Sequence, residues 1–185
     1  DTALNALKEQ AIAEKTKVAT RKASEMCLKA IVPHVPEIVG GSADLAASNL
    51  TFVEGLKTVT GNDYCGNNIM YGIREHAMGA VMNGMALHGG VIPYGGTFFV
   101  FSDYMKPAVR LAALMHLHVI YIWTHDSFRV GEDGPTHQPV EHEAQIRLME
   151  HLKNHRGERS MLVLRPADGE ETVTAWRSRS IVPSR

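Results

Sequence analysis

The chain has 185 residues, of which 44% are hydrophobic and 21% are charged, and its formal net charge is −1. This composition is that of a globular protein, and the scattered charge without a polybasic run argues against nucleic acid or an anionic membrane as a partner. The apolar runs are shorter than the roughly 18–20 residues of a membrane span, and the charged N-terminus has no apolar signal core. Cys27 and Cys65 fit neither a metal nor a redox spacing, which favours a reducing, cytoplasmic location.

The predicted elements alternate between helices and short apolar strands. Apolar residues at helical spacing predict a helix over the first thirty residues, which Pro33 and Pro36 end. Ser42 and Asp44 are suited to cap a following helix, and Pro107 is expected near the first turn of another. We expect strands within 37–41, 69–72, 91–98, 119–126 and 161–168, helices over 74–88, 101–118 and 140–155, a surface connection over 51–68 and a loop over 131–139.

Continuous apolar strands that alternate with helices predict a three-layer α/β/α fold with a mostly parallel central sheet. We expect one domain over residues 1–185. In such folds ligands bind at the carboxyl ends of the strands. Polar clusters directly follow apolar runs, as this rule requires, at 40–45, 95–98, 124–127 and 165–169.

Glu75 stands near the start of an Ala-, Gly- and Met-rich helix. One interpretation is a helix N-terminal carboxylate that favours the macrodipole and pairs with Arg74. The other is a partly buried acid whose pKa is raised by desolvation, so that it shares a proton with a ligand. Small residues would allow another helix or subunit to approach closely, at Gly72, Ala77, Gly79, Ala80 and Gly84.

The segment 124–139 gathers histidines and acids on a loop with two glycines and two prolines. His125, Asp126, Glu132, Asp133 and His137 are its candidate functional residues. A metal site is one interpretation, but the spacing is irregular and there is no helical His pair. We therefore predict that this segment binds no metal. A site that hydrogen-bonds a polyhydroxylated, phosphorylated substrate fits the mixture of donors and acceptors better.

Two further groups have both a structural and a functional interpretation. Phe98, Phe101 and Tyr104 are core residues or a slot for a flat heteroaromatic ring. The members of the second group have a structural interpretation, as a salt-bridging arginine and two cap residues. An arginine and a serine also suit a phosphate group, which is the functional interpretation. This second group consists of Arg21, Asp44 and Ser48.

Several long motifs occur in order: "VATRKASE", "GGSADLAASNLT", "YGIREHAMGAVMNG", "YGGTFFVFSDY" and "GEDGPTHQP". Over about 17–175 the chain resembles the pyrimidine-binding domain of transketolases. The resemblance implies a thiamine diphosphate enzyme that transfers a two-carbon ketol unit between sugar phosphates. It departs from the family pattern at Phe128 and Arg129, in the longer, charged segment 142–160, and after residue 176.

The resemblance also implies roles for the candidate residues. Glu75 is similar to the glutamate that hydrogen-bonds N1′ of the cofactor's aminopyrimidine and shares a proton with it, and His137 to the histidine beside the reacting carbon and substrate oxygens. Phe98, Phe101 and Tyr104 resemble the pocket of the pyrimidine ring. The residues implied to bind substrate are Arg21, Ser48 and His125 at the phosphate, Asp133 at a hydroxyl, and Asp44 as a further active-site carboxylate.

The chain lacks the G-D-G motif, followed some 25–30 residues later by Asn, which in this family holds Mg²⁺ and the diphosphate. The resemblance therefore implies that the diphosphate-binding and C-terminal domains are absent from this chain. It implies either a homodimer or a partner chain that carries the diphosphate-binding domain. Alternatives are an isolated, non-catalytic fragment that dimerises, or a related thiamine diphosphate enzyme such as deoxyxylulose-phosphate synthase.

Overall fold

The computed structural model describes residues 2–14, 18–127, 130–131 and 133–178. Its centre is a four-stranded sheet in the order β2-β1-β3-β4, and every pair of neighbouring strands is parallel. The strands are β1 (Ile38–Ser42), β2 (Asn68–Met70), β3 (Ile92–Phe98) and β4 (Ile120–Thr124). In this register Ser42 lies beside Gly96 and Phe98 beside Thr124, so the carboxyl ends of β1, β3 and β4 meet at one edge.

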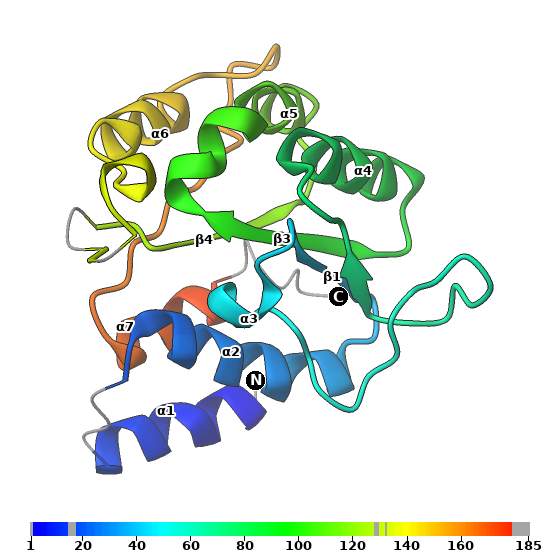
Figure 1. Ribbon diagram of the computed structural model, residues 1–185, viewed down its shortest axis with the longest axis vertical. Coiled ribbons are helices and arrows are strands. Elements are labelled where there is room, and N and C mark those ends of the chain that lie inside the picture. Colours follow the sequence, from blue (N-terminus) through cyan, green and yellow to red (C-terminus); the bar gives the residue numbers. More distant parts are fainter. Residues whose placement is uncertain (1, 15–17, 128–129, 132, 179–185) are drawn as a thin grey trace.

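Helices cover both faces of the sheet, as Figure 1 shows, and the predicted three-layer α/β/α fold is confirmed. On one face lie α1 (Thr2–Glu14), α2 (Thr20–Ile31) and α7 (Gly169–Arg177). On the other lie α4 (Glu75–His88), α5 (Ser102–Leu114) and α6 (His142–Glu150). The short helices are η1 (Val32–His34), α3 (Ala46–Asn49), η2 (Phe99–Phe101) and η3 (Pro135–His137). Throughout the described ranges, every helix is too short or too polar to span a bilayer.

Both central strands carry paired glycines, which leave room for neighbouring elements to pack closely. Gly41 of β1 lies opposite Gly95 of β3. A Cβ atom at Gly41 would lie 1.9 Å from the carbonyl oxygen of Ile69, and one at Gly95 would lie 2.6 Å from the Met82 sulfur. These glycines let β2 and α4 approach the central strands more closely than any larger residue would permit.

A separate core fills the space on each side of the sheet. Beneath it, Leu28, Ile38, Tyr94 and Trp176 join α2 and α7 to β1 and β3. The core on the opposite face is rich in methionine, whose flexible side chain fills irregular gaps, and it joins α4 to α5. Its buried members are Ala43, Tyr71, Met78, Met82, Met105 and Val109.

The sequence predictions were wrong at several element boundaries. The first thirty residues form two helices, α1 and α2, rather than one, and Pro107 lies in the second turn of α5. Ser42 caps no helix: the residue before α3 is Leu45, whose side chain makes no cap, although its N–H donates to the Ser42 hydroxyl at 3.3 Å. The helix predicted over 140–155 ends at Glu150.

The strand predicted over 161–168 is absent from the described sheet. Side chains of α6 bond the backbone of this segment instead. Glu150 accepts from the Val163 N–H at 3.0 Å, and Arg147 donates to the Val163 carbonyl at 2.9 Å. The apolar run indicated a strand, but the backbone groups of Val163 are bonded by α6 side chains rather than by β4.

Tyr94→Phe tests the buried hydrogen bond that joins β3 to the 51–68 connection. The Tyr94 hydroxyl donates to the Thr51 carbonyl at 2.9 Å, and the residue is fully buried. Its loss leaves a buried carbonyl unpaired, so we expect the free energy of unfolding in urea to fall by about 1–3 kcal/mol. The matched control is Tyr121→Phe, which removes a buried hydroxyl that has no hydrogen-bond partner among the described residues, and it should change stability far less. Equal effects of the two variants would contradict this assignment.

Candidate functional site

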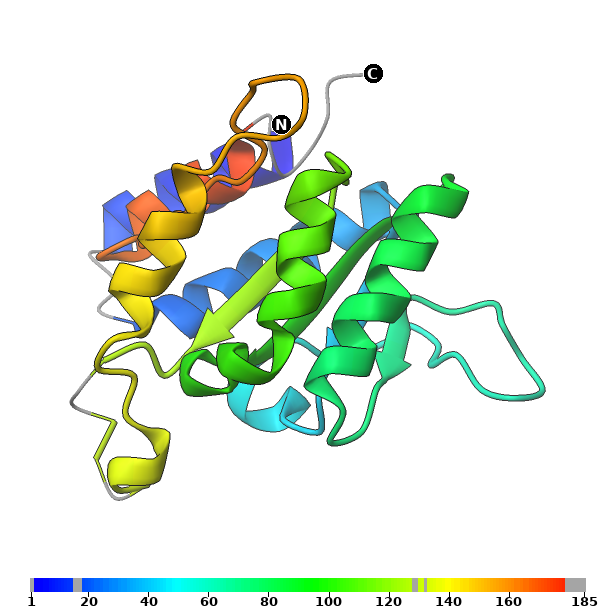
Figure 2. The same cartoon turned by 90° about the horizontal axis from the view of Figure 1, so that it is seen from above.

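Four strands deliver the predicted site residues to one edge of the sheet. Asp44 follows β1, Glu75 follows β2, Phe98 ends β3 and His125 follows β4. Figure 2 shows α3, the starts of α4 and α5, and η3 together along the lower side of the view, where the strands end. The carboxyl ends of parallel strands are where ligands bind in such folds, so this edge is the candidate site.

Phe98, Phe101 and Tyr104 form a continuous aromatic row with two histidines. The Phe98 and Phe101 rings are stacked with centroids 5.9 Å apart, and Tyr104 lies 6.1 Å beyond Phe101. The His137 ring meets the edges of both phenylalanines, 6.0 Å from Phe98 and 5.4 Å from Phe101. Phe98 is buried, whereas 63% of Tyr104 is exposed. The row therefore begins in the core and ends at the surface, where a flat ring has room to stack.

Three described side chains contact the His125 ring. Its ring lies against Phe98 with centroids 3.8 Å apart, its Nε2 is 2.9 Å from Nη1 of Arg21, and its Nδ1 is 2.9 Å from the Thr124 hydroxyl. Its backbone has a φ of 54°, a left-handed conformation that is unfavourable for a residue other than glycine. Such strain is retained where surrounding contacts enforce it, often at functional sites.

Burial and several neighbouring charges act on the protonation of His125. Burial lowers the pKa of the imidazole, and the Arg21 guanidinium lowers it further, while Asp133 and Asp126 oppose the change. Arg21, His125 and Asp133 line one cavity of about 620 Å³ together with Asp126. An arginine, a histidine and a carboxylate around one cavity suit a ligand with both phosphate and hydroxyl groups.

Arg165 clasps the turn that follows β4, a role that the sequence did not indicate. Its Nε donates to the Asp126 carboxylate at 2.8 Å, its Nη2 donates to the Asp126 carbonyl at 3.1 Å, and its Nη1 pairs with Glu143 of α6. Asp126 is thereby committed to Arg165, and the contact restrains the backbone beside His125. Arg165 lies in the polar cluster 165–169, and that position was its sole signal in the sequence.

The remaining predicted residues reach the same edge separately. Glu75 is the first residue of α4 and is partly buried, while Asp44 and Ser48 are exposed. Asp44 also has a left-handed φ, of 61°. None of these three is hydrogen-bonded to the histidine and aromatic cluster within the described part of the chain. Glu132, a further candidate, lies outside the described residues.

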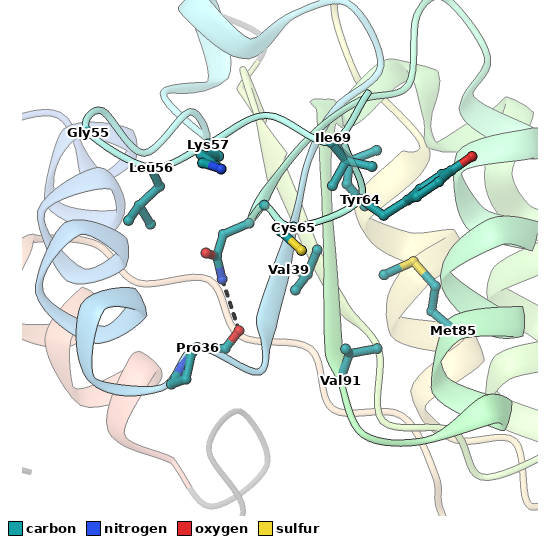
Figure 3. Close-up of a pocket in the computed structure, with 13 residues that line it drawn as sticks. Pro36, Val39, Gly55, Leu56, Lys57, Tyr64, Cys65, Ile69, Met85 and Val91 are labelled. Atoms are coloured by element: carbon teal, nitrogen blue, oxygen red, sulfur yellow. Dashed lines mark hydrogen bonds between the residues drawn. The ribbon is translucent and has the colours of Figure 1, made fainter. Parts of the chain in front are cut away.

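Two other features of the structure are separate from this site. A cavity of about 700 Å³ lies beside β1 and the end of α4. Figure 3 shows its lining residues, which are mainly apolar, such as Val39, Ile69 and Met85. None of the predicted site residues lines it. Among described residues, the potential metal-ligand atoms of Asp103, Glu141 and His142 lie within 4.8 Å of one another. Asp103 is, however, already paired with Lys106 and His142.

Comparison with known proteins assigns the chain to a family. The model of the transketolase pyrimidine-binding domain matches residues 16–182. The chain belongs to this family. It is 56% identical to a transketolase of Halalkalibacterium halodurans over 160 residues, 86% of the chain, and 53% identical to a transketolase of Cereibacter sphaeroides over 174 residues, 94% of the chain. The chain spans about a quarter of these relatives, 23% and 25% of their lengths.

Solved structures agree with this assignment. A Pichia stipitis transketolase in complex with sedoheptulose 7-phosphate has a TM-score of 0.79 at 48% identity, over 89% of this chain and 24% of that one. A Leishmania mexicana transketolase has a TM-score of 0.80 at 49% identity, over 89% of this chain and 23% of that one. These relatives are transketolases, which favours that family over the related thiamine diphosphate enzymes.

Arg21→Met tests the electrostatic coupling within the pyrimidine-binding domain. Removing the guanidinium removes a cation that disfavours a protonated imidazole, so the pKa of His125 should rise toward its ordinary value. Histidine NMR signals followed through a pH titration measure this change. A lowered pKa means that the unfolded chain binds the proton more tightly, so acidification destabilises the fold through His125, and Arg21→Met should weaken that dependence.

The matched control for this titration is Arg110→Met, which removes an exposed arginine of α5. It should leave the pKa of His125 unchanged. A His125 pKa that is the same in Arg21→Met and in the unmodified chain would contradict the coupling.

Proposed function

We propose that this chain supplies the pyrimidine-binding side of a transketolase active site. With a diphosphate-binding partner it transfers a two-carbon ketol unit from a ketose phosphate to an aldose phosphate. Family membership supports the thiamine diphosphate chemistry. The observation that carries the proposal is the aromatic row Phe98, Phe101 and Tyr104 at the carboxyl edge of the sheet, whose phenylalanines contact His137 and His125.

The residues present fit the pyrimidine ring of the cofactor. Phe98, Phe101 and Tyr104 offer stacked and exposed ring faces, and Glu75 at the first turn of α4 offers a carboxyl group. When bound, thiamine diphosphate supplies a nucleophilic carbon and an electron sink. In the proposal Glu75 holds and shares a proton at N1′ of the ring. This role needs a carboxyl group, since an amide in its place would form hydrogen bonds without exchanging protons.

The substrate is proposed to lie between the aromatic row and the start of α2. Arg21, Ser48 and His125 bind its phosphate, and Asp133 accepts from a hydroxyl. His137 lies beside the reacting carbon, within reach of substrate oxygens, because it contacts the same phenylalanines as the proposed ring site. Asp44 is a further carboxylate at this edge.

The proposed enzyme needs residues from outside this chain. In the proposal residues 1–185 act as one pyrimidine-binding domain, and Mg²⁺ and the diphosphate are held by a separate diphosphate-binding domain, in a homodimer or in a partner chain. A solved split-gene transketolase, described as an inactive β4 tetramer, has a TM-score of 0.65 at 25% identity, over 90% of this chain and 49% of that one. It supports the expectation that the isolated chain is inactive.

The partner is proposed to pack on the outward face of α4. Its small residues Ala77, Ala80 and Gly84 are exposed, as are Val81 and Leu87. A place among pentose phosphate reactions follows from the proposed activity. A cytoplasmic location is proposed because both cysteines are free.

Glu75→Ala tests the proposed proton sharing. The chain is assayed for ketol transfer with and without a polypeptide that carries a diphosphate-binding domain. We expect turnover only with that polypeptide, and we expect Glu75→Ala to lose nearly all of it. The control Glu54→Ala removes an exposed carboxylate that contacts Lys29 on the surface, and it should keep full activity. Turnover of the Glu75 variant within tenfold of the unmodified chain, about 1.4 kcal/mol in barrier, would refute the role.

His125→Ala tests the proposed phosphate contact in the same assay. Loss of the imidazole should raise the KM for phosphorylated ketoses and leave kcat comparatively unchanged, since the phosphate lies away from the reacting carbon. Unphosphorylated ketoses provide the comparison, and the exposed His88 provides a matched variant, His88→Ala. An equal rise in KM for both classes of ketose would rule out a phosphate contact.

A further inference from the structure

A chain of hydrogen bonds runs from the interior of the sheet to His125. The Ser42 hydroxyl donates to the Gly96 carbonyl at 2.9 Å, and the Asn49 amide nitrogen donates to the Ser42 hydroxyl at 2.8 Å. The Thr124 hydroxyl donates to the Asn49 amide oxygen at 2.6 Å and lies 2.9 Å from Nδ1 of His125. Ser42 and Asn49 are each 1% exposed and Thr124 is 7% exposed, so the chain is buried up to the histidine.

The direction of every bond in this chain follows from counting protons. The Gly96 carbonyl only accepts, so the Ser42 hydroxyl donates its single proton to it and must accept from Asn49. That requirement places the Asn49 NH₂ group toward Ser42 and its oxygen toward Thr124. Thr124 then donates its own proton to Asn49, and it can only accept from His125. Nδ1 of His125 therefore carries a proton.

The opposite side of the imidazole gives the same answer independently. Nη1 of Arg21 lies 2.9 Å from Nε2 of His125. A guanidinium only donates, so Nε2 must offer a lone pair. Both partners select the neutral tautomer with the proton on Nδ1, and in a histidine the bond made by one nitrogen sets the state of the other.

We propose that Thr124 and Asn49 are positioning residues that hold His125 in the Nδ1–H form, so that phosphate binding at this edge is coupled to proton uptake at Nε2. The coupling rests on the proposed function, in which His125 contacts the phosphate, whereas the tautomer does not. In the Nδ1–H form Nε2 has no proton to donate to a phosphate oxygen. It becomes a donor once it takes a proton from solvent, while Arg21 turns to the anion.

The charges around His125 favour such an exchange. Arg21 from α2 disfavours the protonated ring in the free chain, as does His137 from the loop, while Asp126 and Asp133 favour it. A dianionic phosphate adds negative charge beside Nε2 and engages the guanidinium that opposed protonation. Asp126 contributes less than its position suggests, because Arg165 neutralises it.

The first experiment measures the tautomer in the full 185-residue chain by long-range ¹H–¹⁵N NMR of the histidines near neutral pH. We expect an unprotonated Nε2 and a protonated Nδ1 at His125. Because Arg21 selects the same tautomer, the variants are made in the Arg21→Met background. There Thr124→Val, which keeps the shape but has no hydroxyl, should lose this pattern, and Thr124→Ser should keep it. The matched control is Thr51→Val in the same background, since the Thr51 hydroxyl is buried and has no partner among the described residues. A proton on Nε2 in the unmodified chain, or no difference between Thr124→Val and Thr124→Ser in the Arg21→Met background, would overturn the positioning role.

The second experiment measures proton uptake with inorganic phosphate as the probe. Calorimetric titrations are made at a pH where free phosphate is already the dianion, so that the probe itself exchanges no proton, in buffers of different ionisation enthalpy. They should show up to about one proton taken up per phosphate in the unmodified chain, and clearly fewer in Thr124→Val, where a neutral Nε2–H is accessible. Binding without proton uptake would overturn the coupling and leave the proposed function intact. The absence of any phosphate binding would overturn the coupling together with the proposed phosphate site, while the tautomer measurement still decides the positioning role.

Discussion

The hydrogen bond from the Ser42 hydroxyl to the Gly96 carbonyl joins the two central strands where both end. Its geometry depends on the parallel register that sets Ser42 opposite Gly96. A side chain at position 96 would collide with Thr51, since a Cβ atom there would lie 2.7 Å from a methyl carbon of that residue. The bond also orients Asn49, and through Asn49 it orients Thr124 and His125. The strand register in the core therefore helps to orient side chains at the edge where the predicted site residues lie.

The edge itself combines rigid and exposed parts. Phe98 and His125 are fixed by the core, by ring contact and by the clasp that Arg165 makes around Asp126. Farther along the aromatic row, Phe101 is partly exposed and Tyr104 largely so. A ligand or a partner that covers these rings would bury apolar surface that the chain alone leaves in water. Such a gradient from buried to exposed is suited to a domain whose site is completed by another polypeptide.

The sequence predicted the sheet well because continuous apolar runs indicate parallel strands buried on both faces. It failed where local pattern and tertiary contact disagree. The run over 161–168 has strand-like composition, but Arg147 and Glu150 of α6 bond the backbone of Val163. For the site, long motifs and their resemblance to a family indicated the aromatic row and His125. The roles of Asn49 and Thr124 were out of reach, because their contact joins residues 75 positions apart and has no signature in either segment.

The small residues of α4 show how the same composition serves two different contacts. The sequence suggested that they let a neighbour approach closely, and Gly79 does so within the chain, since a Cβ atom there would lie 2.7 Å from the Cβ of Ala108. Gly84 has open space around it instead, and Ala77 and Ala80 are exposed. One face of the helix is thus matched to α5. The opposite face carries similarly small residues, and no described residue packs on it at Gly84. Glu75 begins this helix, so a partner bound to the exposed face would lie next to the proposed proton-sharing carboxylate.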